Sequence, residues 1–122
     1  MLIIMIDYKD TRPIYEQVVE KIQMLILKGV LESNSKMPSV RTLAMELSIN
    51  PNTIQKAYAE LERRGFIYTV KGRGNFVSYD NNLVEFKKDD LKEKLMLIIN
   101  EAKEIGMNET DIIDYIKQGD KA

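Results

Sequence analysis

The chain has 122 residues, 44% of them hydrophobic and 30% charged, with a net charge of −1. This length fits one compact domain with a small appendage and excludes two large domains, and the composition is that of an ordinary globular protein. The sequence contains no cysteine and no histidine, which excludes disulfides, thiolate catalysis, zinc fingers and the commonest general base, so we expect no enzyme, no metal site and no cofactor.

Charge is unevenly divided along the chain. Residues 1–78 contain 11 Lys and Arg against 8 Asp and Glu, a net charge of +3, whereas residues 79–122 contain 7 against 11, a net charge of −4. We therefore expect a mildly basic body at 1–78 and an acidic tail at 79–122.

The first six residues, MLIIMI, form an apolar opening segment. It is far shorter than the roughly 20 residues of a membrane span, and it lacks the basic flank and cleavage site of a signal peptide. We interpret it as a short strand or a packing arm. Together with the absence of cysteine, it predicts an intracellular, cytoplasmic protein that does not bind a membrane.

Two helices are expected before residue 48. Pro13 suits the first turn of a helix, and an apolar stripe at helical spacing then runs toward Gly29, formed by Ile14, Val18, Ile22, Leu25 and Ile26. After a loop over residues 30–38, Ser39 suits the N-cap of a second, short helix that ends at Leu47.

A third helix is expected from Asn50, which can cap it, to Gly65, which can end it, with Pro51 in its first turn. The helical spacing predicts a core face of Ile54, Ala57, Tyr58 and Leu61 and an opposite face of Asn52, Gln55, Lys56, Ala59 and Arg63. The second and third helices together form a helix-turn-helix.

A hairpin follows the third helix. Residues 66–70 and 75–78 have the apolar pattern of strands, and KGRG at 71–74 provides a glycine-rich, basic tip. A hairpin directly after a helix-turn-helix makes a winged helix. The expected fold is therefore mainly α with a small β-hairpin, with the winged helix-turn-helix domain at residues 1–78.

The tail, residues 79–122, is expected to hold a linker and two helices. Residues 79–88 are polar and form the expected linker, one helix starts at Asp89 and ends before Gly106, and Asn108 caps the last helix. Two amphipathic helices of this size cannot bury their own apolar stripes, so we expect a dimerisation region. The residues expected in the dimer contact are Leu91, Leu95, Ile98, Ile112 and Ile116.

The polar face of the third helix suits DNA. The side-chain amides of Asn52 and Gln55 can pair with adenine in the major groove, and Lys56 can reach guanine or a phosphate. For an isolated helix the alternative is that these side chains are merely solvated. The neighbouring hairpin favours DNA binding.

Residues near that helix suit the phosphates. Arg41, with Ser39 and the backbone amides at the start of the second helix, can contact the DNA backbone, and the alternative for Arg41 is an ion pair with Glu46. Tyr58 is expected in the core, with its hydroxyl as a candidate phosphate contact.

The hairpin tip offers a second basic element. Lys71 and Arg73 flank Gly72 on a slim tip that suits a minor groove. The alternative is an ordinary turn whose charges are solvated. No combination of carboxylates with a nucleophile or base predicts catalysis.

Three runs, PSVRTLAMEL, NPNTIQKAYAELERRGFI and KGRGNFV, resemble in this order the DNA-binding domain of the GntR family of bacterial transcription regulators. The resemblance covers roughly residues 13–78. The short remainder and its two-helix pattern are similar to the YtrA subfamily, whose tail is implied to serve dimerisation. The length excludes the MocR branch, which carries an aminotransferase-like domain.

The resemblance implies DNA contacts at Arg41, at the start of the recognition helix and at the wing; the other positions are Asn50, Asn52, Thr53, Gln55, Lys71 and Gly72. Many relatives have an arginine where this chain has Pro51. Without that arginine, the side chains left to read the bases are those of Asn52, Thr53, Gln55 and Lys56. Members of the subfamily are often repressors of transporter operons.

The sequence thus predicts a sequence-specific regulator of double-stranded DNA, a repressor that acts as a homodimer on a pseudo-palindromic operator. An alternative from another class is a winged-helix protein-interaction module that docks on a larger partner. The sequence leaves open whether a small-molecule effector binds between the wing domain and the tail helices, because no residue constellation identifies such a site.

Overall fold

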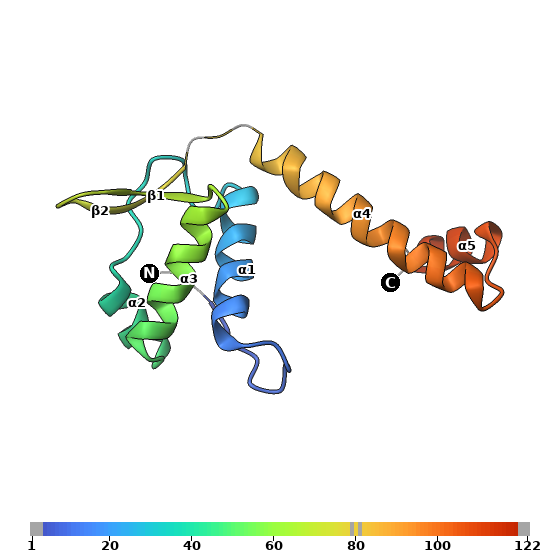
Figure 1. Cartoon of the computed structure of the whole chain (residues 1–122), viewed down its shortest axis with the longest axis horizontal. Coiled ribbons are helices and arrows are strands. Elements are labelled where there is room, and N and C mark those ends of the chain that lie inside the picture. The colour runs from blue at the N-terminus through green and yellow to red at the C-terminus, as the bar shows by residue number, and fades with distance from the viewer. Residues whose placement is uncertain (1–3, 79, 81, 120–122) are drawn as a thin grey trace. The chain divides into compact units, whose positions relative to one another are not determined.

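The computed structural model describes residues 4–78, 80 and 82–119. It divides into two compact units, one up to Leu83 and one from Val84 (Figure 1). The elements in chain order are α1 (Ile14–Leu27), α2 (Val40–Leu47), α3 (Pro51–Arg63), β1 (Ile67–Val70), β2 (Gly74–Val77), α4 (Leu83–Glu104) and α5 (Glu109–Gly119). Residues 1–3 of the expected opening arm lie outside the described part, and Ile4 belongs to the core of the first unit.

The helix-turn-helix forms where local capping chemistry predicts it. At the start of α2, Ser39 Oγ accepts a hydrogen bond from the backbone N–H of Thr42 at 3.1 Å. At the start of α3, Asn50 Oδ1 accepts one from the N–H of Asn52 at 2.8 Å. These bonds satisfy backbone donors that have no partner within the helix. The predicted N-caps, and the predicted place of Pro51 in the first turn, are confirmed.

The central helix of the first unit is α3, which packs against α1, α2 and β1. Figure 1 shows α1 and α3 side by side. The predicted core face of α3 is buried, and it meets apolar side chains from the other elements. This core includes Val18, Val19 and Ile22 of α1, Leu43 and Ala44 of α2, Ile54, Ala57, Tyr58 and Leu61 of α3, and Phe66, Ile67 and Val77 at the hairpin. Because the core takes one side of α3, its opposite face remains exposed.

The predicted hairpin is present. Strands β1 and β2 pair antiparallel, with Ile67 opposite Val77 and Val70 opposite Gly74. Its base is anchored in the core through Ile67 and Val77, which are 2% and 1% exposed. Its tip extends away from the helices of this unit (Figure 1). The first unit is therefore a winged helix.

The segment before α2 differs from the expected loop over residues 30–38. Lys36 forms an antiparallel bridge with Phe76 of β2, and the N–H of Met37 donates to the carbonyl of Asn75 at 2.8 Å. A short stretch of backbone is thus paired along the free edge of β2. Local sequence does not reveal this pairing, because the partner strand lies far along the chain.

In the tail, α4 begins at Leu83, earlier than the predicted start at Asp89. Asp80 forms a turn just before this start, in which its carboxylate accepts a hydrogen bond from the N–H of Asn82 at 2.8 Å. Leu83 also packs into the core of the first unit and is only 7% exposed. Polar composition predicted a linker here, but the helix already begins at Leu83, which is anchored in the core.

The second unit has no buried side chain between residues 84 and 119, all of which the structure describes. Asn108 caps α5 as predicted: its Oδ1 accepts from the N–H of Asp111 at 2.9 Å, and its own N–H donates to Asp111 at 3.0 Å. Among the described residues, none of the helices combines the length and apolarity needed to cross a membrane.

Candidate nucleic-acid interface

The exposed face of α3 presents the two side-chain amides that the sequence singled out. Asn52 and Gln55 are exposed, and neither side-chain amide has a hydrogen-bond partner in the described part of the chain. Thr53 is half-buried beside them. The oxygen of Asn50 is engaged in the cap, which leaves its NH₂ group to face outward as a donor. This face is rich in groups that can both donate and accept.

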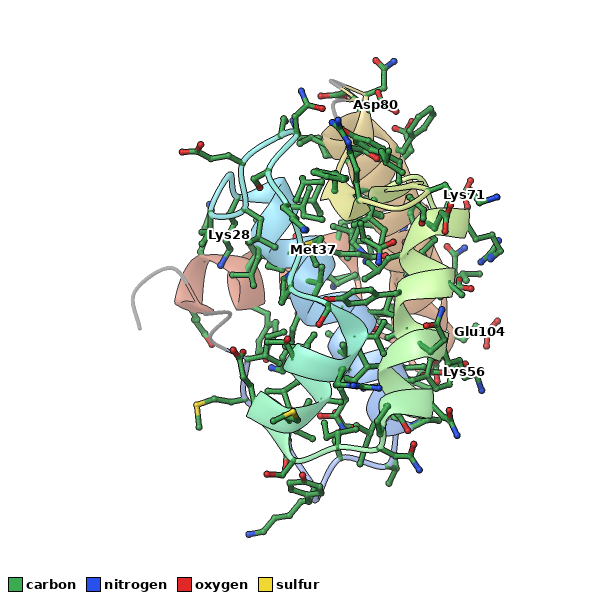
Figure 2. All side chains as sticks on the ribbon, turned by 90° about the vertical axis from the view of Figure 1, so that its left-hand side faces the viewer. Lys28, Met37, Lys56, Lys71, Asp80 and Glu104 are labelled. Carbon is green, nitrogen blue, oxygen red and sulfur yellow. The ribbon has the colours of Figure 1, made fainter. Side chains whose placement is uncertain are left out.

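Lys56 has a contact that the sequence did not predict. Its Nζ lies 3.9 Å from the centroid of the Tyr15 ring on α1, which is the geometry of a cation–π interaction. Figure 2 shows Lys56 on the outer side of α3. The ammonium group is therefore drawn toward α1, to the flank of the face that carries Asn52 and Gln55.

Tyr58 lies in the core, as its spacing predicts, and is only 2% exposed. Its hydroxyl donates to the carbonyl of Pro38 at 2.8 Å. Burial and the negative charge of Glu46 raise the pKa of the Tyr58 hydroxyl. Since a phenol has one proton to donate, and this proton is held by Pro38, the structure argues against a phosphate contact by Tyr58. The residue instead ties α3 to the segment before α2.

Arg41 and Ser39 are both exposed at the start of α2. The expected alternative, an ion pair between Arg41 and Glu46, is not formed, and Arg41 pairs with no described acidic residue. Ser39 is occupied locally, because its hydroxyl caps α2 and lies 2.8 Å from Thr42 Oγ1. The guanidinium of Arg41 is thus the available group at this helix end.

The wing tip carries Lys71, Gly72 and Arg73, all exposed. Neither basic side chain forms an ion pair with a described residue, and Figure 2 shows Lys71 projecting outward. Gly72 has φ +79° in this tight turn, a conformation that other residues rarely adopt. The tip therefore presents two positive charges on a narrow backbone.

A surface groove of about 350 Å³ lies between the wing and the start of α2. It is lined by Ser39, Lys71 and Arg73, together with a basic residue that sequence reasoning missed, Lys36. The sequence offered no signal for Lys36, because only the pairing of its backbone with β2 brings it next to the wing.

Three arginines of the first unit differ from these cations because they form ion pairs. Arg12 is held by Asp10 and Glu20, and Arg63 and Arg64 are held by Glu60. The two guanidinium groups hold the pKa of the Glu60 carboxyl at about 2, well below its ordinary value of 4.5. Arg63 was expected on the open face of α3, but its charge is neutralised there.

Four cations border the groove or the neighbouring end of α2 without an ion pair to any described residue, and we refer to them as the unpaired cations: Lys36, Arg41, Lys71 and Arg73. They belong to the same winged helix as α3, which exposes the amides of Asn52 and Gln55. Within the described residues, no group of three or more acidic side chains is placed to share a metal ion.

The model of the bacterial regulatory proteins of the gntR family matches residues 14–77, more than half of the chain. The chain belongs to the gntR family. It is thus a DNA-binding regulatory protein with a winged helix-turn-helix, as the three sequence runs indicated, and its family is regulatory rather than enzymatic.

Several GntR relatives are similar over nearly their whole length. The transcriptional repressor YtrA of Bacillus subtilis is 42% identical over 117 residues, which cover 94% of this chain and 90% of that protein. A GntR regulator from Listeria monocytogenes has a similar structure, with a TM-score of 0.78 and 41% identity over 89% of this chain and 96% of that one. The predicted resemblance to the YtrA subfamily is confirmed.

A further solved relative is bound to DNA. The DNA-binding domain of AraR, in complex with the operator ORE1, superposes with a TM-score of 0.54 and 29% identity, covering 64% of this chain and 95% of that one. The fold of the first unit is therefore similar to that of a DNA-binding domain bound to its operator.

The tail of this GntR protein leaves large apolar side chains exposed. Of the five residues expected in a dimer contact, Ile112 is half-buried, and the other four, Leu91, Leu95, Ile98 and Ile116, are 51–63% exposed. Further large apolar side chains of the tail are also exposed, among them Phe86, Leu97 and Tyr115. Leu97 and Ile98 are adjacent in sequence and lie on different sides of α4, so the helix is apolar on more than one face.

Proposed function

We propose that this GntR protein is a sequence-specific transcriptional repressor that binds a pseudo-palindromic DNA operator as a homodimer, in the bacterial cytoplasm. The observation that carries the proposal is that one winged helix presents both the unpaired cations, beside the wing and at the start of α2, and the free amides on the exposed face of α3. Repression is proposed because YtrA of Bacillus subtilis, which is similar over most of its length, is a repressor.

The residues of the interface divide by chemistry into two roles. Arg41, Lys71 and Arg73 would hold phosphates and set the position of the protein on DNA, since phosphate contacts carry little sequence information. Asn52 and Gln55 would read base edges in the major groove, where an amide can pair bidentately with adenine. With Pro51 in the first turn, the start of α3 contributes no charged side chain to this reading.

The tail supports the homodimer. No side chain from residue 84 to residue 119 is buried, although Leu95, Leu97, Ile98 and Ile105 are large and apolar. Exposed apolar surface of this extent marks an interaction site. A second copy of the chain offers an identical apolar surface, and a two-fold dimer would present two recognition helices about 34–36 Å apart, on successive turns of the DNA major groove.

The proposal is tested by selecting bound sequences from random double-stranded DNA with the purified full chain. We expect enrichment of an inverted repeat and a much weaker affinity for random DNA, by about 1,000-fold or more at physiological salt. Enrichment of a single, unrepeated half-site would contradict the dimeric mode of binding. No retention of DNA, together with co-purification of a defined protein, would support a protein-interaction module instead.

A further inference from the structure

We propose that Lys36 binds a DNA phosphate in the groove between the wing and α2, and that Gly74 positions its side chain there. The inference rests on the proposed DNA-binding function and adds a contact outside the recognition helix and the wing tip. It also gives the glycine at position 74 a role beyond the turn.

The backbone of Lys36 is held in place by the sheet. Lys36 is bridged to Phe76, and its neighbours are also paired with β2. The N–H of Met37 donates to Asn75 O at 2.8 Å, and the N–H of Val77 donates to Ser35 O at 2.9 Å. The side chain of Lys36 therefore starts from a rigid point beside the wing, and binding would not require ordering of a loop.

The stem of the Lys36 side chain lies across Gly74. A Cβ atom at position 74 would be 3.3 Å from Lys36 Cε, closer than an ordinary van der Waals contact. The missing side chain of Gly74 thus leaves the space in which the end of Lys36 lies. A long aliphatic stem that packs against backbone and keeps its charge in solvent is favourable for lysine.

The groove has the charge and shape of a phosphodiester site. Lys36, Lys71 and Arg73 line it from two sides, with Ser39 at its edge. None of these three cations has an ion-pair partner in the described part of the chain. Glu46 borders the neighbouring hollow that Lys36 also lines, but no ion pair joins the two residues. Three like charges around one groove are stabilised by an anion between them, and the DNA backbone supplies a row of anions.

The first test compares Lys36→Ala with Lys28→Ala, a matched control. Lys28 is an exposed lysine next to the end of α1, without an ion pair to a described residue. Affinities for a selected operator and for random DNA are measured at several salt concentrations. We expect Lys36→Ala to weaken both by about fivefold or more and to reduce the slope of log affinity against log salt by about 0.9, the loss of one phosphate contact. We expect Lys28→Ala to behave as the wild type.

The outcomes separate this inference from the proposed function. If the wild type binds DNA and Lys36→Ala keeps the wild-type salt slope, the phosphate contact is refuted and the function stands. If the wild type does not bind DNA, the proposed function itself fails. Lys36→Arg keeps the charge, so it should restore the slope; an Arg variant as defective as Ala would refute a role through charge.

The role of Gly74 is tested by a double-mutant cycle with Lys36. Both Gly65 and Gly74 have positive φ, at +83° and +116°, but an added Cβ meets a neighbour only at Gly74. Gly65→Ala, outside the proposed interface, therefore controls for backbone strain. We expect Gly74→Ala to weaken DNA binding in the wild type and to have little further effect in Lys36→Ala. Equal losses in both backgrounds would refute the positioning role, and thermal unfolding curves show whether each variant is folded.

Discussion

Single side chains decide the chemistry of the proposed DNA-binding surface, and neighbouring residues of α3 have opposite roles. Asn52 and Gln55 are exposed amides without partners in the described part of the chain. Tyr58, one turn further on, is buried and bonded to the carbonyl of Pro38. Helical spacing predicted which residue points inward. The hydrogen-bond partner of the Tyr58 hydroxyl could be identified only from the tertiary structure, because Pro38 belongs to the segment before α2.

Gln55→Ala should relax base preference at one operator position. We expect the binding free energy to weaken by about 1–3 kcal/mol on operators with the preferred base and to change little on random DNA. The reason is that an amide that reads a base adds discrimination between bases rather than general affinity. Competition binding with operators substituted one base pair at a time measures this. Gln118→Ala, an exposed glutamine of α5, is the control, and an equal loss on operator and random DNA would reject the base-reading role.

Tyr58→Phe should affect stability and not the phosphate contacts. The variant removes one buried hydrogen bond to Pro38, so we expect a loss of about 1 kcal/mol in the free energy of unfolding, with scatter of about half that. Urea unfolding gives this value, and DNA titrations give the salt slope. A smaller salt slope for the Phe variant would show that the hydroxyl does contact a phosphate.

Among the elements, α4 is the one that the first unit and the tail share. Its first residue, Leu83, is buried in the core of the first unit, whereas its following apolar residues are exposed. A helix of 22 residues is about 33 Å long, and water does not favour a helix of this length that is apolar on several faces. In the proposed homodimer, the second copy would cover these side chains and stabilise the helix.

Leu95→Asp should dissociate the proposed homodimer. A charge placed in an apolar contact is costly to desolvate, and we expect a monomer at micromolar concentration by sedimentation velocity. Because a monomer contacts only one half-site, its affinity for an inverted repeat should be about 100-fold weaker than that of the dimer. Val30→Asp, at an apolar side chain of the first unit that is 65% exposed, is the control. A wild type that sediments as a monomer would contradict the dimer at once.

For the whole molecule, acid conditions should remove part of the stability. The pKa of Glu60 is lowered to about 2 by Arg63 and Arg64, and the pKa of Asp10 is lowered to about 2 by Arg12. A carboxyl whose folded pKa lies below its unfolded pKa stabilises the fold above the unfolded value, and this contribution is lost as the pH falls toward the folded value. The chain has no histidine, so no such group titrates near neutral pH.

We therefore expect the free energy of unfolding to fall between pH 4.5 and pH 2. Glu60→Gln removes one of the two carboxyls whose pKa is lowered in the folded state, so the fall in the free energy of unfolding should be less steep. The urea midpoint of wild type and variant, measured at pH 7 and at steps down to pH 2.5, tests the expectation. Identical pH profiles would show that the Glu60 ion pairs contribute nothing to stability.

Much of this molecule follows from short-range rules. Ser39, Asn50 and Asn108 marked three helix starts correctly, because a capping side chain bonds to backbone only two or three residues away. Periodicity likewise identified the buried face of α3, and three sequence runs identified the family. The division into a winged helix and a helical tail needed no coordinates.

Other features were decided only by the tertiary structure. Lys36 lies beside the wing because its backbone pairs with β2. Helix α4 starts earlier than expected because Leu83 packs against core residues that are far away in sequence. Lys56 turns toward Tyr15, and Arg63 is neutralised by Glu60. In most of these cases the partner lies far away in sequence, and even the nearby Arg63–Glu60 pair is one choice among several acidic neighbours. The sequence by itself determined the helices, the hairpin and the family, whereas only the folded chain decided which cations remain free to meet DNA.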